Sequence, residues 1–78
     1  MNNLETYKKA FLSIFPIKEE KLEKLEYNQI DEWDSIGHMT LISALEEQYK
    51  ISFDTDDIVD FSSFQKGIEI LKKYKVEI

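Results

Sequence analysis

The sequence predicts a single all-α domain built from three longer helices and one short helix. Apolar residues recur at three- and four-residue intervals in three stretches, which is the spacing of a helix face packed against a core. Neither paired alternating stretches nor internal repeats are found. At 78 residues the chain is long enough for one domain, and a domain of this size buries about 60 % of its unfolded surface. We therefore expect a small core.

The first helix is expected to run from a cap at Asn3 to about Phe15, and Pro16 ends it. Its apolar stripe consists of Leu4, Tyr7, Phe11, Ile14 and Phe15. The pattern weakens over residues 17–34, which we interpret as a long ordered loop, with a short helical turn compatible with residues 18–25. The apolar residues that would hold this loop to the body are Leu22, Leu25, Ile30 and Trp33. Loops of this length in small domains usually have a function.

The second helix is expected to begin at Asp34 or Ser35 and to run to about Tyr49. Its buried stripe consists of Leu41, Ile42, Leu45 and Tyr49, with Met39 at the edge. The opposite, solvent-facing side carries Ile36, Thr40, Ser43 and Glu47. Gly37 in the first turn lowers the stability of the helix by about 1 kcal/mol relative to alanine. The close approach of another backbone or of an attached group would be one reason for a glycine at this position.

A brief third helix is expected over about residues 56–60, with its cap at Asp54 or Thr55. Its inward-facing residues would be Ile58, Val59 and Phe61. The acidic residues here, Asp54, Asp56 and Asp60, also suggest a calcium loop. An EF-hand loop requires glycine at its sixth position and glutamate at its twelfth, where this chain has Val59 and Gln65, so a calcium site is not expected.

The last helix is expected to begin after a capping box formed by Ser62 and Gln65 and to end near Tyr74. Its apolar stripe consists of Phe64, Ile68, Leu71 and Tyr74. Gly67 falls on the same face, and its missing side chain would let two helices come close.

Acidic residues are concentrated between Glu26 and Asp60. This segment holds ten acidic residues and one lysine, a net charge of −9, whereas the rest of the chain carries +3. Such a polarised surface favours basic partner proteins, with association that weakens as salt rises. The sequence has no arginine, and its acidic half repels a phosphate backbone, so nucleic-acid binding is not expected.

The sequence contains no cysteine, which excludes disulfides, a thiolate nucleophile and a thiolate metal site. Residues 1–5 show neither the basic start nor the apolar run of a signal peptide. No apolar stretch approaches the roughly 20 residues that span a bilayer. We therefore expect a cytoplasmic protein, and a monomer because the core is small and the charge is high.

The segment Asp34-Ser35-Ile36 carries the most specific chemistry in the sequence. It places a serine hydroxyl at the first turn of a helix, where free N–H groups and the helix dipole stabilise a negative charge such as a phosphodiester. Aspartate and serine are also among the commonest residues that simply cap a helix. Features elsewhere in the sequence are needed to distinguish an attachment site from a simple helix cap.

Two further segments favour an attachment site: Ala44-Leu45-Glu46-Glu47, and residues 53–58. Together with Asp34-Ser35-Ile36 they resemble the acyl carrier protein family, which has an Asp-Ser-Leu attachment motif, an Ala-Leu-Glu-Glu run after it and a similar entry to its third helix. The resemblance implies a four-helix acyl-carrier-type bundle in which residues 1–78 form one attachment domain. It also implies that Ser35 receives 4'-phosphopantetheine from coenzyme A, that the chain itself is not an enzyme, and that the body shelters a short acyl chain between its apolar stripes.

Partner enzymes of this family dock on the second helix through basic patches. The acidic contacts that the resemblance implies are Asp34, Glu46, Glu47, Asp56 and Asp57. The apolar contacts would be Ile36 and Met39. The implied partners are a phosphopantetheinyl transferase and the enzymes that load and transfer acyl or aminoacyl groups.

Four residues depart from the pattern of fatty-acid carriers. Gly37, His38 and Thr40 stand where those carriers usually have further acids, and Trp33 replaces a small residue before Asp-Ser. These departures indicate a specialised pathway, such as polyketide, peptide or surface-glycan modification. Gly37 is also similar to the glycine in D-alanyl carriers of cell-wall modification, and fatty acid synthesis is a further alternative.

Two other classes of protein fit parts of the sequence. Ser35 and His38 are neighbours on one helix surface, like a nucleophile and its base, but a hydrolase also needs an orienting acid and an oxyanion hole. We instead expect His38 to be a partly covered residue near the exit of the attached arm. An unmodified helical interaction module would share the fold and the acidic surface, and modification of Ser35 distinguishes it from a carrier.

Overall fold

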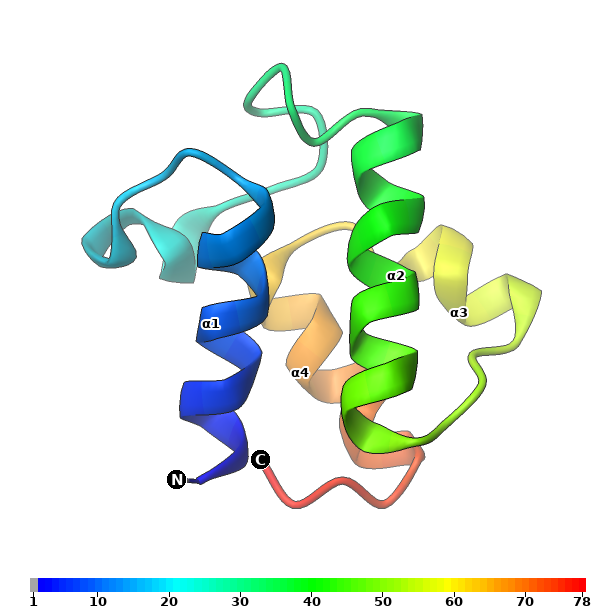
Figure 1. Cartoon of the computed structure of the whole chain (residues 1–78). Helices are drawn as coiled ribbons and strands as arrows, with labels where there is room; N and C mark the ends of the chain where they lie inside the picture. The colour runs from blue at the N-terminus through cyan, green and yellow to red at the C-terminus, as the bar shows by residue number, and fades with distance from the viewer. Residues whose placement is uncertain (1) are drawn as a thin grey trace.

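Four α-helices and one 3-10 helix make up the regular structure of residues 2–78, the part of the chain that the computed structural model describes (Figure 1). In chain order these are α1 (Asn3–Ile14), η1 (Glu19–Lys24), α2 (Ser35–Tyr49), α3 (Thr55–Asp60) and α4 (Phe64–Lys73). The all-α prediction is confirmed for this range, with α3 as the short helix. Extended backbone pairs there only in an isolated bridge between Glu26 and Ser63. None of the helices over residues 2–78 combines the length and the apolar character needed to cross a membrane.

The cap of α1 lies one residue before the predicted one. Asn2, not Asn3, is the N-cap, because its side-chain oxygen accepts a hydrogen bond from the Glu5 amide at 2.8 Å. The Asn3 side chain instead donates to the carbonyl of Glu77 at 2.7 Å, so the two ends of the chain lie side by side (Figure 1). The helix ends just before Pro16, as predicted.

The long segment between α1 and α2 is held to the body by the predicted apolar anchors. The side chains of Leu22, Leu25 and Trp33 are buried. Ile30 is half-buried, and η1 occupies the predicted helical turn. The backbone of this segment also meets the start of α4, because the Tyr27 amide donates to Ser62 and the Phe64 amide donates to Leu25, at 2.8 and 2.9 Å. The segment is therefore part of the packed structure.

Two details of α3 and α4 differ from the prediction. The N-cap of α4 is Ser63 rather than Ser62, and its hydroxyl accepts from the Lys66 amide at 2.9 Å. In α3, Val59 was expected to pack inward but is 74 % exposed. The inward position is taken instead by Asp57, whose side chain finds polar partners in α4 and the residue after it.

Phe11 of α1 lies at the centre of a core in which half of the buried apolar side chains are aromatic. Its ring centroid is 5.0 to 6.4 Å from the rings of Tyr7, Phe15, Trp33, Phe61 and Phe64. From α2 the core receives Leu41, Ile42 and Leu45. Leu4, predicted in the stripe of α1, lies at the margin and is 37 % exposed.

Gly67 leaves room on α4 for two aromatic side chains, that of Tyr7 from α1 and that of Phe61 after α3. A Cβ atom at this position would overlap the Tyr7 hydroxyl and the ring of Phe61. The Tyr7 hydroxyl is itself buried and donates to the Phe64 carbonyl at 2.7 Å. The missing side chain at Gly67 therefore admits two aromatic side chains, whereas the prediction was the close approach of a second helix.

Candidate functional site

Ser35 is the first residue of α2, and its side chain is exposed. The preceding Asp34 is the N-cap, because its carboxylate accepts from the Gly37 amide at 2.9 Å. The Ser35 hydroxyl lies 3.5 Å from the Tyr27 hydroxyl, and either of them can donate. Because Asp34 provides the cap, the Ser35 hydroxyl is left available for other chemistry.

The loop before α2 lies directly against the helix at Gly37. A Cβ atom there would overlap the carbonyl oxygen of Glu32 and would come within 3.3 Å of the Phe15 ring. This is the close approach of another backbone that would account for a glycine in the first turn. The contact fixes the loop on the helix and thereby positions Ser35 between them.

Trp33 anchors the same loop in the core. Its side chain is fully buried and stacks on the Phe15 ring at 5.5 Å, with 26° between the ring planes. Its carbonyl accepts from the amide of Asn28, a residue with a left-handed backbone (φ 66°). Its indole N–H donates to Nδ1 of His38 at 2.9 Å. Trp33, a departure from the fatty-acid carriers, therefore holds the segment that presents Ser35.

Both ring nitrogens of His38 are used inside the fold. The Trp33 indole can only donate, so we assign Nδ1 as the acceptor and place the proton on Nε2. Nε2 then donates to the carbonyl of Ile58 at 2.8 Å. The side chain is only 9 % exposed, which confirms that this first-turn residue is covered. With both nitrogens engaged elsewhere, His38 is not positioned to take a proton from Ser35.

Tyr27 is a residue near Ser35 that the sequence analysis did not identify. It is 39 % exposed, and its ring stands edge-on to that of His38 at 5.4 Å. It also lines a pocket of about 270 Å³ with His38, Ile58, Val59, Phe61 and Ser62. Tyr27 lies in an irregular loop, so no helical or strand periodicity in the sequence indicates where its side chain lies. Its approach to Ser35 depends on the turn at Asn28.

An apolar strip extends along the exposed side of α2 from Ser35. Ile36 is 79 % exposed and Met39 is 49 % exposed. With Ser35, Thr40 and Ser43 they line a shallow groove of about 540 Å³. The predicted solvent-facing side of α2 is confirmed, and it begins at the serine.

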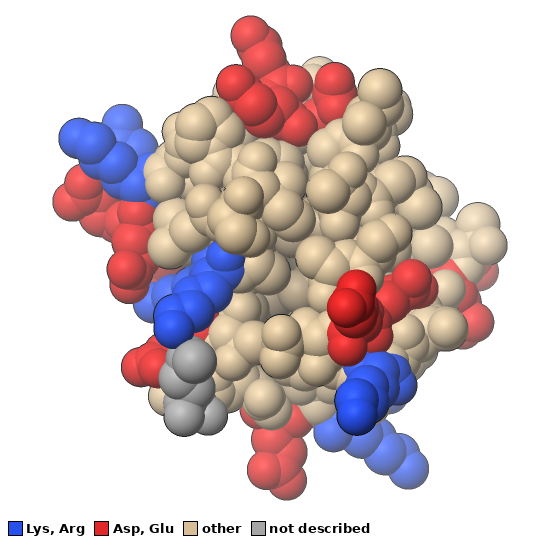
Figure 2. Space-filling view, viewed as in Figure 1, with Lys and Arg blue, Asp and Glu red and all other residues tan. Residues whose placement is uncertain are grey.

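Three of the predicted acidic contacts are exposed: Asp34, Glu47 and Asp56. Glu46 is half-buried, and its carboxylate accepts from the Phe53 amide at 2.8 Å, so it orders the connection from α2 to α3. Figure 2 shows acidic side chains at the top of the view, over the loop before α2, and at the right near α3, with a largely uncharged surface between them. We call the exposed carboxylates just before and within α2, those of Asp34 and Glu47, the acidic margin of the apolar strip.

Asp57 does not lie on this surface, and its prediction as a docking contact is wrong. It is only 4 % exposed, and its two carboxylate oxygens accept from Lys73 Nζ and from the Tyr74 hydroxyl, each at 2.6 Å. The hydrogen bond from Lys73, followed by that from Tyr74, holds the pKa of Asp57 below its usual value. The same bond raises the pKa of Lys73. Asp57 therefore ties α3 to the end of α4.

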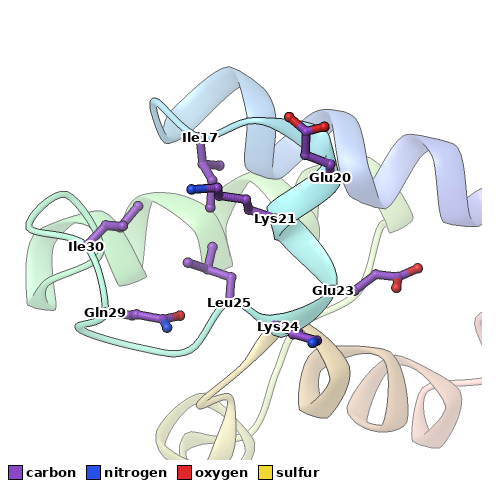
Figure 3. Close-up of a pocket in the computed structure, with 8 residues that line it drawn as sticks. All are labelled: Ile17, Glu20, Lys21, Glu23, Lys24, Leu25, Gln29 and Ile30. Carbon is purple, nitrogen blue, oxygen red and sulfur yellow. The ribbon is translucent and has the colours of Figure 1, made fainter.

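The pocket in Figure 3 lies beside η1 and the following loop rather than at Ser35. Its volume is about 430 Å³, and Ile17, Leu25 and Ile30 form its apolar side. The polar side chains around it are Glu20, Lys21, Glu23, Lys24 and Gln29. It contains none of the predicted site residues. Over residues 2–78, no three acidic or histidine side chains are grouped so as to hold a metal ion.

Ser35 thus combines an exposed hydroxyl, a helix start, an apolar strip and an acidic margin. No protein-family model, no curated protein and no solved structure matches the chain.

Proposed function

We propose that this chain is a carrier protein that bears 4'-phosphopantetheine on Ser35 and presents acyl or aminoacyl groups to partner enzymes. The observation that carries the proposal is the exposed Ser35 hydroxyl at the start of α2. Because Asp34 is the N-cap of this helix, the Ser35 hydroxyl is not used as a cap. The order of the helices, with a short α3, and the Asp34-Ser35-Ile36 motif support it further. When attached, the group supplies a flexible thiol that holds the cargo as a thioester.

The surroundings of Ser35 suit a phosphodiester. The first amides of a helix have no partner within the helix, and a negative charge near them is stabilised by about 0.3–1 kcal/mol. The Asp34 carboxylate accepts a hydrogen bond from only one of these amides, that of Gly37. The exposure of Ser35 lets a transferase reach the hydroxyl, and the firm anchoring of the loop by Trp33 presents it in one place.

The surface around Ser35 suits a basic partner with an apolar centre. Ile36 and Met39 offer apolar contacts beside the attachment point. The exposed carboxylates of Asp34, Glu47 and Asp56 would steer lysine- or arginine-rich surfaces of the transferase and of the loading and transfer enzymes. Glu46 contributes less, because its carboxylate is engaged with the Phe53 amide.

An unmodified interaction module is the second candidate. The same apolar strip at Ile36 and Met39 favours it, because exposed apolar side chains beside charged ones mark protein-binding surfaces. Such a module would bind its partner without any group on Ser35. Modification of Ser35 therefore separates the two candidates.

The test is the intact mass of the protein after incubation with coenzyme A, magnesium and a broad-specificity phosphopantetheinyl transferase. We expect the native chain to gain one phosphopantetheine and Ser35→Ala to gain none. Ser43→Ala is the matched control, because Ser43 is another exposed serine on the same helix, and this variant should be modified normally. A folded native chain that gains no mass with this transferase or with others would leave the interaction module as the better assignment.

A further inference from the structure

We propose that the cargo on Ser35 stays outside the helical body, and that this carrier therefore takes short acyl or aminoacyl groups. The inference rests on the proposed function and names its class of cargo. It differs from the sheltered acyl chain that the family resemblance implies. Three features of the structure support it. The seam, which is the contact line between α2 and α3, is closed by a hydrogen bond; the space behind it is filled by aromatic rings; and a pocket lies on the outside.

One hydrogen bond closes the seam between α2 and α3, and a second, from the loop residue Trp33, holds the His38 ring that makes it. The Trp33 indole donates to His38 at 2.9 Å, and His38 donates to the carbonyl of Ile58 in α3 at 2.8 Å. His38 lies one turn after Ser35, so the closed part of the seam is the part nearest to the attachment point. A chain entering there would break these bonds and would leave a buried donor and acceptor unpaired, which is costly.

The space behind this seam is filled by three rings. The centroids of Trp33 and His38 are 6.1 Å apart in a stacked arrangement, and the Phe61 ring stands edge-on to both, at 6.5 and 5.8 Å. Trp33 and Phe61 are almost completely buried. Since protein interiors are close-packed, an acyl chain could enter only by displacing these rings.

The external pocket of about 270 Å³ offers the cargo a place outside the seam. Tyr27 belongs to this pocket, and its hydroxyl lies 3.5 Å from that of Ser35, so a group attached to the serine reaches the pocket across Tyr27. Val59 at its rim is 74 % exposed, so the pocket is open to solvent. An acyl group that lies in this open pocket therefore stays in contact with water and outside the packed interior.

The test compares the native chain loaded with acetyl- and with octanoyl-phosphopantetheine, each transferred from the corresponding acyl coenzyme A. We expect the two forms to unfold within about 1 °C of each other, because the additional methylene groups stay in water in both the folded and the unfolded state. A Tm that is higher by about 4 °C or more in the octanoyl form would show that the chain is buried, and would overturn the inference. Failure to modify Ser35 is visible as an unchanged mass before any melting experiment, and it would remove the proposed function itself.

Variants of His38 test whether this residue closes the seam. In His38→Ala we expect the octanoyl form to melt above the acetyl form, because the chain can then enter. His38→Gln is the matched control: its amide can accept from Trp33 and donate to Ile58, so it should behave like the native chain. Should His38→Ala not fold, Trp33→Phe keeps an aromatic ring and removes the indole donor. An equal Tm for both loaded forms in the seam-opening variant would overturn the assignment of His38 as the closing residue.

Discussion

The start of α2 and the junction between α3 and α4 both place a carboxylate in or beside the first turn of a helix, yet they use it in opposite ways. Asp34 bonds locally, to the Gly37 amide of its own helix. Asp57 bonds over a long distance, to Lys73 and Tyr74, which lie sixteen and seventeen residues later. The first arrangement leaves its neighbour Ser35 exposed, whereas the second is itself buried.

The difference shows what makes an acidic residue available to a partner. A carboxylate whose hydrogen bonds stay within one turn keeps its outer side in solvent and can still attract a basic surface. A carboxylate that joins two helices is neutralised within the fold and contributes to stability instead. We therefore expect changes at the start of α2 to affect modification, and changes at the α3–α4 junction to affect unfolding.

The largest losses of stability are expected from alanine at the two helix glycines, Gly67 and Gly37. The Cβ of Gly67→Ala would overlap the Tyr7 hydroxyl and the Phe61 ring, and overpacking of this kind costs about 1–3 kcal/mol. Gly37→Ala should cost no less, because its Cβ would overlap the Glu32 carbonyl oxygen, a backbone atom, and pushing the Glu32 backbone away should also slow modification of Ser35. Urea unfolding and transferase rates measure the two effects. Slower modification of Gly67→Ala under conditions where it is folded would contradict the separation of the two regions.

Asp57→Asn should lower Tm at neutral pH by several degrees and leave modification of Ser35 unchanged. The variant loses the charged partner of Lys73 in a buried position. Asp56→Asn is the matched control, because the neighbouring Asp56 is exposed and should change Tm little. Thermal unfolding followed by circular dichroism compares the three proteins, and an equal Tm for both variants would contradict the role assigned to Asp57.

The contribution of Asp57 to stability should also depend on pH. Its folded pKa lies below its usual value, so the contribution is complete above the unfolded carboxyl pKa of about 3.9 and is lost as the pH falls through the lower folded pKa. The Tm difference between the native chain and Asp57→Asn should therefore stay constant from neutral pH down to about pH 4 and shrink on further acidification. A difference that stays constant down to about pH 3 would contradict this account.

The contrast between the two regions also explains which features were predictable. Helices and their buried stripes follow from local spacing, and so α2 and its solvent-facing side from Ile36 were placed correctly. The caps at Asn2 and Ser63 were each missed by one residue, because an equally suitable Asn or Ser stands next to them. Asp57 was misassigned because its partners lie in α4 and the residue after it, and no local pattern in α3 indicates them.

The contacts around His38 were hidden from sequence analysis for the same reason. Its burial follows from the helical angle, but its two hydrogen bonds require the loop residue Trp33 and the α3 carbonyl of Ile58 to meet it. The position of Tyr27 beside Ser35 likewise depends on a turn in an irregular segment. The exposed position of Ser35 at a helix start was predictable because the signals for a helix start are local.

Two cap variants should separate the same two regions with smaller losses of stability. Asp34→Ala and Ser63→Ala each remove one side-chain acceptor at a helix start, and each should cost about 1 kcal/mol in unfolding free energy. Only Asp34→Ala should also slow the transferase, because Asp34 borders Ser35 and is exposed. Denaturant midpoints and initial rates of modification measure both quantities. Equal rates for the two variants would mean that Asp34 acts only as a cap.

The smallest change in stability is expected for Ile36→Ala, which truncates a side chain that is 79 % exposed and should alter the unfolding free energy by no more than about 0.5 kcal/mol. If the apolar strip on α2 is where partners dock, this variant should still raise the KM of the transferase severalfold. Leu4→Ala is the control, because Leu4 is a partly exposed apolar residue in the first turn of α1, and the start of α1 lies at the opposite end of the molecule from the start of α2 (Figure 1). A KM raised equally by both variants would point to general surface hydrophobicity, whereas an effect confined to Ile36 would mean that the residue next to the serine, and not the acidic margin alone, determines recognition.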